Sequence, residues 1–338
     1  MRTPPGGQST RPVMADVARL AGVSHQTVSR VLNEHPNVSR ATKEDVLAAI
    51  RELGYRRNAA ARALVTGRTR TLGVISFDTT IFGPASMLYG VERAAHPGYS
   101  VVVANVPAPG GTGMLEAVER CLEQAVEGLI VIAPHTAAIA ALASVAAEVP
   151  LVAVKCGTRS SLPSVAIDNA AGAERATRHL LDLGHRTVHH VAGPATWLDA
   201  DDRVAGWRRA LAAVGAPEPE MLRGDWSALS GYQIGLRLAR VPEVTAVFCA
   251  NDQMALGLIR ALAEAGRWVP GDVSVVGFDD IPESGFFWPP LTTVKQDFGE
   301  LGKRAVAMLV ERISGHPAQQ VEPVVPDLIV RASTAPAS

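Results

Sequence analysis

Six side chains that can hydrogen-bond to nucleic acid follow one another closely near the start of the chain. They are His25, Gln26, Thr27, Ser29, Arg30 and Asn33. A glutamine can pair with the edge of adenine and an arginine with that of guanine, whereas serine and threonine hydroxyls suit phosphate oxygens. The residues between them, such as Val28 and Val31, are apolar and fall at helical spacing. The segment is therefore a candidate helix with one buried face and one face that reads DNA.

Three short helices are predicted to carry and support this segment. The first stops at Gly22, and the second occupies residues 25–32 behind the capping side chain of Ser24. The third begins after the capping residue Ser39 and ends at Gly54. The first two helices form a helix-turn-helix, whose second helix fits the major groove. A basic helical hairpin without a DNA role is the alternative that the helices alone leave open.

Charge is distributed unevenly along the 338 residues. Residues 1–70 contain twelve Lys and Arg against five Asp and Glu, whereas the remaining residues contain 20 basic and 28 acidic side chains. A basic head on an acidic body is typical of a polyanion-binding module attached to a second domain. The apolar runs are too short to span a bilayer and the N-terminus lacks the apolar stretch of a secretory signal, so we expect a cytoplasmic protein without a membrane partner.

The head resembles the DNA-binding domain of the LacI/GalR family of repressors. The resemblance lies in the stretches Asp16–Ala18, Ala21–Asn33, Val38–Thr42 and Leu53–Tyr55, and it continues over nearly the whole chain. It implies a homodimer that binds double-stranded operator DNA. The chain departs from the family at Val13, where a threonine that would cap the first helix is usual.

The resemblance also identifies residues 57–64 as the family's hinge helix, which orders on the operator. It implies DNA contacts by Asn58 and by Leu64, the latter as an apolar wedge in the minor groove. The family usually has proline where this chain has Arg57. A helix this short does not hold together alone in water, so an Ala-rich linker is the alternative before DNA binds.

From Thr71 onward, β-rich runs alternate with amphipathic helical segments, which predicts parallel sheets covered by helices on both faces. There are too many strands for one such sheet, so we expect two lobes with a ligand cleft between them. The fold class is thus a small all-α helix-turn-helix head followed by an α/β two-lobed body, and the resemblance implies a periplasmic-binding-protein-like body with three crossovers. The strands are expected at Leu72–Phe77, Ser100–Ala104, Gly128–Ile132, Leu151–Val154, Val165–Ile167, Val188–Ala192, Ala246–Cys249 and Val273–Gly277.

Several stretches of the body match a sugar-responsive member of the family. They are Ala205–Trp207, Gly224–Gly231, Ala250–Gly257, Ser274–Asp280 and Pro289–Phe298. Sugar hydroxyls both donate and accept hydrogen bonds, which suits polar side chains, and an indole offers a flat face to a pyranose ring. A structural cap or core role is the alternative for any one of these side chains. The candidate ligand-binding residues are Lys155, Arg203, Trp226, Asn251, Asp279, Gln296 and Phe298.

Lys155 stands where that family member has an aspartate that contacts its inducer, so the sugar cannot be copied from it. Trp197, Asp199 and Asp201 also replace smaller or basic residues nearby. A glycoside or oligosaccharide is expected rather than a purine. Neither a metal nor a cofactor is expected, because the three cysteines are widely spaced and His189 and His190 would point to opposite faces of a strand.

These observations predict a transcriptional repressor that a sugar inducer releases from its operator. A regulator that uses its ligand as a corepressor and a sugar-binding protein without a DNA role remain alternatives, whereas no catalytic set indicates an enzyme. The C-terminal ASTAPAS lacks the apolar heptads of a tetramer, which favours a dimer. We expect a disordered tail at 1–12, the DNA-binding domain at 13–57, a hinge and linker at 58–70, the ligand-binding and dimerisation body at 71–331 and a C-terminal tail at 332–338.

Overall fold

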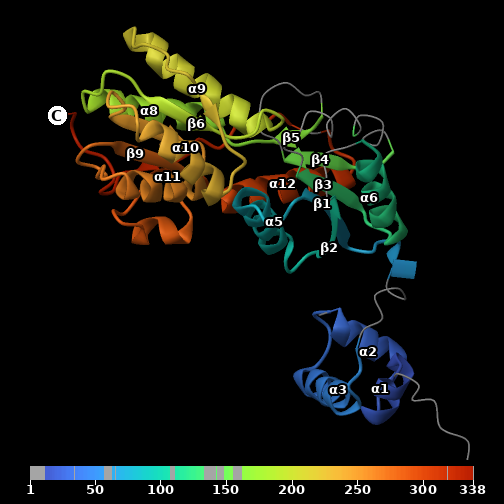
Figure 1. The fold of residues 1–338 in the computed structure, drawn as a ribbon. Coiled ribbons are helices and arrows are strands. Elements are labelled where there is room, and N and C mark those ends of the chain that lie inside the picture. The colour runs from blue at the N-terminus through green and yellow to red at the C-terminus, as the bar shows by residue number, and fades with distance from the viewer. Residues whose placement is uncertain are drawn as a thin grey trace, which may run out of the picture. The chain divides into compact units, whose positions relative to one another are not determined.

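The computed structural model describes residues 12–33, 35–56, 63, 64, 66–106, 111–132, 142, 148–154, 162–317 and 319–337. The chain divides into two compact units, Met1–Thr69 and Arg70–Ser338, each with its own core (Figure 1). No helix in the described ranges is long and apolar enough to cross a membrane.

The first unit contains the three predicted helices, α1 (Met14–Leu20), α2 (His25–Leu32) and α3 (Arg40–Leu53). Their shared core consists of buried small and β-branched side chains, Val17, Ala18, Val28, Val31, Val46 and Ala49. The predicted caps are confirmed. The Ser24 and Ser39 hydroxyls each accept a backbone N–H three residues on, at 3.1 Å, and Gly54 ends α3 with a left-handed φ of 60°.

The missing threonine cap of α1 is compensated from inside the helix. Val13 occupies the N-cap position and offers no side-chain hydrogen bond. The Asp16 carboxylate instead accepts the backbone N–H of Val13 at 3.0 Å, and its charge lies at the positive end of the helix dipole. The departure from the family pattern at position 13 therefore does not leave the helix start without a side-chain contact.

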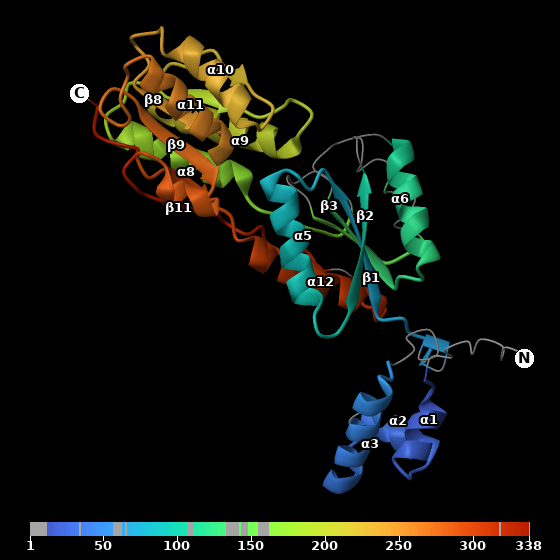
Figure 2. The same ribbon diagram turned by 60° about the horizontal axis from the view of Figure 1, so that its bottom comes forward.

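The first lobe of the body contains a parallel five-stranded sheet of order β2-β1-β3-β4-β5. Helix α6 (Gly111–Glu123) covers one face, whereas α5 (Phe82–Ala95) and α12 (Phe298–Ile313) cover the other (Figure 2). The strands are β1 (Thr71–Phe77), β2 (Ser100–Val106), β3 (Gly128–Ile132), β4 (Leu151–Val154) and β5 (Ser164–Val165).

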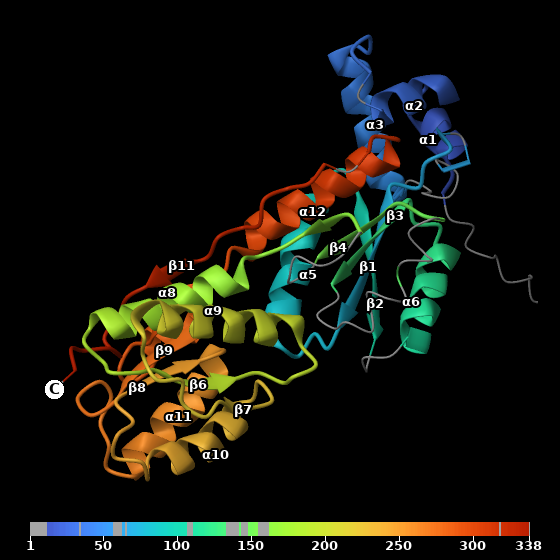
Figure 3. The ribbon, with the colours of Figure 1, turned by 90° about the horizontal axis from the view of Figure 1, so that it is seen from above.

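The second lobe contains a six-stranded sheet of order β11-β10-β9-β8-β6-β7, in which only β11 runs antiparallel. Figure 3 shows α8 (Asn169–Asp182) and α9 (Leu198–Val214) on one face and α10 (Ala228–Leu238) and α11 (Asp252–Glu264) on the other. A short 3₁₀ turn, η1 (Pro282–Phe286), follows β9. The strands are β6 (His189–Ala192), β7 (Leu222–Arg223), β8 (Ala246–Cys249), β9 (Ser274–Asp279), β10 (Thr292–Lys295) and β11 (Asp327–Ile329).

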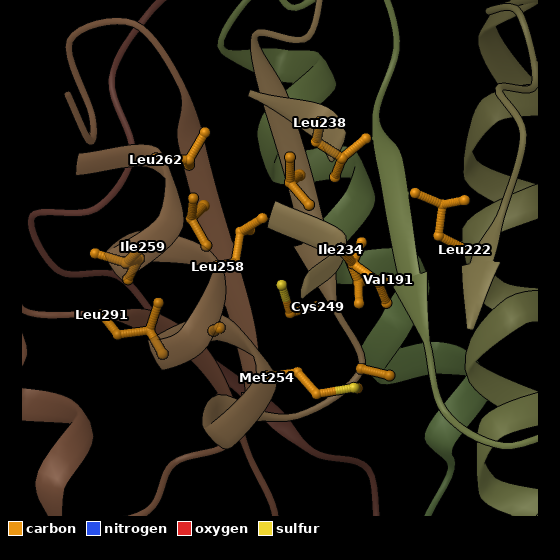
Figure 4. Close-up of a cluster of buried hydrophobic side chains, with 14 of the residues drawn as sticks. Val191, Leu222, Ile234, Leu238, Cys249, Met254, Leu258, Ile259, Leu262 and Leu291 are labelled. Carbon is orange, nitrogen blue, oxygen red and sulfur yellow. The ribbon is translucent and has the colours of Figure 1, made fainter. Parts of the chain in front are cut away.

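The core beneath α10 and α11 is apolar and closely packed (Figure 4). Leu258 and Leu262 of α11 belong to the same cluster of buried side chains as Ile234 and Leu238 of α10. The two helices approach so closely that a Cβ on Gly257 would overlap the carbonyl oxygen of Ala228. A glycine is therefore required at that position by the backbone of the neighbouring helix.

Three segments cross between the lobes, as the resemblance implies. The chain leaves the first lobe between β5 and α8, returns between β10 and α12, and leaves again between α12 and β11. The first and third segments pair through Ile167 and Val324, and the N–H of Asp168 donates to the carbonyl oxygen of Val324 at 2.9 Å. The two-lobed fold is confirmed.

Two details differ from the expectations. Strands β7, β10 and β11 were not among the expected strands. The segment expected to be a tail from residue 332 is attached to β9, because the buried Ser333 hydroxyl donates to the carbonyl oxygen of Val275 at 2.6 Å. Periodicity alone did not reveal this, since the segment is short and has no apolar pattern.

Candidate functional site

The polar face of α2 is exposed where the sequence predicted base-reading side chains. His25, Gln26 and Arg30 are exposed, and among the described residues their side chains take part in no hydrogen bond. Val28 and Val31 lie on the opposite face and are buried against α1 and α3. The core thus fixes the orientation of the helix and leaves these three side chains available to a ligand.

The other three predicted residues of α2 are held within the helix. The Thr27 hydroxyl lies 2.9 Å from that of Ser24, so it belongs to the helix cap. The Asn33 amide donates to the Ser29 hydroxyl at 3.4 Å. These three positions are therefore restrained beside the free side chains of His25, Gln26 and Arg30.

In the body, the predicted residues gather around the guanidinium of Arg203, which is 4% exposed. Its Nε donates to Asn169 Oδ1 at 2.8 Å and its Nη1 donates to the carbonyl oxygen of Ala250 at the end of β8. Its Nη2 lies 3.7 Å from Asp279 Oδ1, and its central carbon lies 3.9 Å from the ring centroid of Phe278. The positively charged guanidinium thus contacts a carboxylate, two carbonyl-type oxygens and an aromatic face.

Asp279, the last residue of β9, links Arg203 to the second crossover. Gln296 donates its amide Nε2 to Asp279 Oδ1 at 2.5 Å. Burial raises the pKa of Asp279 to about 6, although Arg203 and the hydrogen bond from Gln296 both act to lower it. The structure therefore brings together three predicted residues, Arg203, Asp279 and Gln296, in one buried network.

Trp226 and Asn251 lie next to this network. The guanidinium carbon of Arg203 is 5.5 Å from the Trp226 ring, and Trp197 meets the same indole edge-on at 5.5 Å. Asn251 donates to the carbonyl oxygen of Trp226 at 2.9 Å and caps α11 by accepting the N–H of Met254 at 2.9 Å. In this state the Asn251 side chain is therefore a structural cap, which was the stated alternative to ligand binding.

Phe298 is the first residue of α12 and belongs to the first lobe. It packs edge-on against Phe82 with ring centroids 6.0 Å apart. Phe82 also packs against the second lobe's cluster that contains Trp226. Phe82 therefore contacts the cores of both lobes.

Two of the gathered residues have a left-handed backbone that side-chain-bearing residues rarely adopt. The φ angles are 74° at Trp226 and 111° at Asp279. Such strain is retained where the surrounding structure holds a side chain in a required place, and it concentrates at binding sites. Asp279 ends β9 and Trp226 follows β7, so both lie at the carboxyl ends of parallel strands, where ligands of α/β proteins bind.

Comparison with known proteins identifies the family. Residues 13–58 match the lacI family of bacterial regulatory proteins, and residues 177–334 match the periplasmic binding protein-like domain. The chain is 36% identical to the lactose operon repressor of Escherichia coli K12 over 94% of this chain and 89% of that protein. The chain belongs to the lacI family.

Solved structures of family members have the same fold over nearly the whole chain. The lac repressor dimer bound to operator and the anti-inducer ONPF matches with a TM-score of 0.86 at 36% identity, covering 96% of this chain and all of that one. The transcriptional regulator CelR in complex with cellobiose matches with a TM-score of 0.70 at 34% identity and the same coverage. The predicted family and fold class are both confirmed.

Three of the predicted residues have no contact that tests their roles. Lys155 and Asn58 lie outside the described residues. Leu64 is described and its side chain is 87% exposed. The roles of all three stay predictions.

Two members of the buried network were not among the predicted site residues. Asn169 accepts from Arg203, as above, and its Nδ2 donates to Asp199 Oδ1 at 3.4 Å. Asp199 was noted only as a departure from the family, and Asn169 gave no signal because its role depends on the contact between α8 and α9. Packing, rather than spacing along the chain, joins these residues.

The histidine pair has a structural explanation. His190 is buried between Trp207 and Phe248, stacked on the latter at 4.6 Å, whereas His189 is half-buried on the other face. Burial lowers the pKa of His190 to about 3, so it stays neutral. The described ranges contain no group of three or more residues that could hold a metal ion.

Proposed function

We propose that this lacI-family protein is a repressor that binds a pseudo-palindromic operator as a homodimer and is released from it by a sugar or glycoside. One observation carries the proposal: a single chain combines exposed base-reading side chains on α2 with a buried polar network beside an indole face. The first feature suits double-stranded DNA and the second suits an uncharged, hydroxyl-rich ligand.

Base recognition is assigned to the three free side chains of α2. Arg30 can form a bidentate pair with guanine and Gln26 with adenine, each worth about 1–3 kcal/mol of discrimination against a wrong base. His25 lies in the first turn, the part of a recognition helix that faces the base edges. Asn58 and Leu64 are proposed to order in the hinge and to enter the minor groove, which would couple the head (13–57) to the body (71–331) through residues 58–70.

The dimer is proposed to form through the body. Phe286 and Trp288, in and after η1, are 90% and 88% exposed. Large aromatic side chains are enriched at protein interfaces and are unfavourable in water. A two-fold dimer would place two heads on symmetry-related half-sites, as in the lac repressor dimer bound to operator.

Ligand binding is proposed to weaken operator binding. A ligand between the lobes would draw together the Arg203 network and the Phe82–Phe298 contact, which belong to different lobes. The first lobe adjoins the hinge in the sequence, so its displacement would separate the hinge helices. Such coupling between two sites is typically worth about 1–3 kcal/mol and acts equally in both directions.

Two other functions are disfavoured by the same features. A sugar-binding protein without a DNA role would not need the polar face of α2, and an enzyme would need a catalytic set in place of the Arg203 network.

A repressor acting on chromosomal DNA would work in the bacterial cytoplasm. Corepression differs from induction only in the sign of the coupling.

The test is an electrophoretic mobility-shift assay with the full chain on sites selected from random DNA. We expect enrichment of a two-fold symmetric site and at least a fivefold rise in its Kd on adding cellobiose, lactose or maltose. Arg30→Ala should abolish the selectivity, whereas Arg178→Ala, an exposed arginine of the body, should not. Absence of any preferred site would refute the repressor function, and tighter binding with sugar would indicate a corepressor.

A further inference from the structure

Arg70 is the first residue of the body, and its main chain is held by two segments of the first lobe. The division between the two compact units falls between Thr69 and Arg70. The carbonyl oxygen of Arg70 accepts the N–H of Ser100, the first residue of β2, at 2.9 Å. The N–H of Arg70 donates to the carboxylate Oε1 of Glu127 at 2.7 Å. The chain that enters the body is therefore attached to β2 and to the turn between α6 and β3.

The backbone of Arg70 has a conformation that an arginine rarely adopts. Its φ angle is 51°, in the left-handed region. The linker residue Gly67 also has a left-handed φ, of 67°, but glycine adopts this region without a steric penalty. A side-chain-bearing residue keeps such a conformation only where its surroundings determine it. The hydrogen bonds to Arg70 therefore hold a strained geometry at the point where the linker meets the sheet.

Glu127 is held in place through both of its neighbours in the sequence. Val126 is buried in the core that α6 covers. Gly128 lies so close to α12 that a Cβ would come within 2.8 Å of the Leu309 side chain. The N–H of Glu127 itself donates to the carbonyl oxygen of Thr71 at 2.8 Å. The carboxylate is thus presented to Arg70 by a backbone that the core of the first lobe positions.

The carboxylate is the part of this attachment that depends on the residue type. The hydrogen bonds from Ser100 and from the Glu127 N–H are made by main-chain groups, which almost any sequence supplies. The bond to the Arg70 N–H requires a side-chain acceptor, and an ionised acceptor forms a stronger hydrogen bond than a neutral one. Without it, the Arg70 backbone can relax toward an ordinary conformation, and the direction in which the linker leaves the body changes.

We propose that Glu127 is a positioning residue for operator recognition. Its carboxylate determines where and in which direction the linker (58–70) leaves the first lobe, and thereby the half-site spacing that the dimer accepts. The proposal rests on the proposed function, because spacing matters only to a dimer on a two-fold symmetric site. It adds to that function a connection through which a displacement of the first lobe reaches the linker, namely the turn between α6 and β3.

The experiment is a mobility-shift titration of the full chain on three DNAs. They are the symmetric site that the unmodified protein selects, the same site with one base pair inserted at its centre, and random-sequence DNA. The insertion moves one half-site by about 3.4 Å and turns it by about 35° around the DNA axis. We expect the unmodified protein to bind the lengthened site about tenfold more weakly than the selected site.

Glu127→Ala should bind the selected site about tenfold more weakly than the unmodified protein does, since one charge-assisted hydrogen bond is lost. Its ratio of Kd values for the lengthened and selected sites should fall to about one to three, because the linker exit no longer enforces one spacing. Its Kd for random DNA should not change, because the heads are intact. A ratio of two Kd values from one preparation does not depend on the fraction of folded protein.

Two variants serve as matched controls. Glu127→Gln keeps an amide oxygen as the acceptor, so it should retain the discrimination between the two spacings. Glu123→Ala removes the same charge from the last residue of α6, where the side chain is exposed and takes part in no hydrogen bond with the described residues. It should bind all three DNAs as the unmodified protein does.

The possible failures can be told apart. If the unmodified protein prefers no site over random DNA, the proposed function fails and the inference fails with it. If a site is preferred but Glu127→Ala discriminates between the spacings as the unmodified protein does, Glu127 has only a structural role and the repressor function stands. Equal losses in Glu127→Gln and Glu127→Ala would also overturn the inference, and so would equal binding of both spacings by the unmodified protein.

Discussion

Removal of the Arg203 guanidinium should destabilise the body in a strongly pH-dependent manner. Methionine at this position keeps an apolar stem over Phe278 but removes the only cation found among the described residues of the network. Asp279 and Asp199 then remain buried without a counter-charge. Breaking a buried ion pair from one side costs about 3–5 kcal/mol.

The sign of the pH effect follows from the pKa values. Burial already raises the pKa of Asp279 to about 6 and that of Asp199 to about 7, and Arg203 opposes both increases. Without Arg203 both pKa values rise further, so the folded variant keeps its protons at pH values where the unmodified protein has released them. Compared with the unmodified protein, the variant therefore loses stability as pH rises through about 6–8 and recovers it as pH falls. At pH 5.5 only the lost hydrogen bonds remain, about 1–2 kcal/mol.

The assay is urea unfolding of the full chain, followed by far-ultraviolet circular dichroism at pH 5.5 and pH 8. We expect Arg203→Met to lose about 2 kcal/mol more at pH 8 than at pH 5.5. Arg209→Met, on the same helix but exposed, should lose less than about 0.5 kcal/mol at either pH. Equal losses for Arg203→Met at the two pH values would refute the electrostatic reasoning.

Three further predictions concern packing, capping and assembly. Gly257→Ala should lower the free energy of unfolding by about 1–3 kcal/mol, because its Cβ would overlap Ala228 O. Gly83→Ala has room for its Cβ and should change the free energy of unfolding little in the same urea assay. A larger loss for Gly83→Ala than for Gly257→Ala would contradict the packing argument. Ser24→Ala should lower the melting temperature of the head and reduce its stability by about 1 kcal/mol, because the α2 cap is lost. The measurement is calorimetry of the full chain, and an unchanged melting transition of the head would show that the cap is unimportant. Trp288→Asp should convert the dimer to monomers in sedimentation-velocity runs, and a variant that stays dimeric would place the interface elsewhere.

The sequence predicted elements best where the local signal and the tertiary structure agree. The ranges of β3, β4 and β8 were predicted correctly, and so was that of α2, since buried strands form short apolar runs and α2 has a serine cap. Strands β7 and β11 were missed because they are two and three residues long and depend on pairing with a neighbouring strand.

The candidate site was predicted more through family resemblance than through chemistry visible in the sequence. Arg203, Asp279 and Gln296 come from α9, β9 and a crossover, so their contact requires the sheet order to be known. Asn251 illustrates the converse problem, because one asparagine can cap a helix or bind a ligand and the sequence is the same in both cases. Asp199 was underrated since its importance comes from burial, which no single position reveals.

The three crossovers also determine when each lobe can fold during synthesis. The face of the first sheet that α5 covers is completed by α12, whose Phe298, Leu301 and Leu309 belong to the same core as Leu72 of β1. More than two hundred residues separate these partners, and most of the second lobe is encoded between them. On the ribosome, the first lobe must therefore keep part of its apolar face uncovered until residue 313 has emerged, which makes it a natural client for a chaperone during translation.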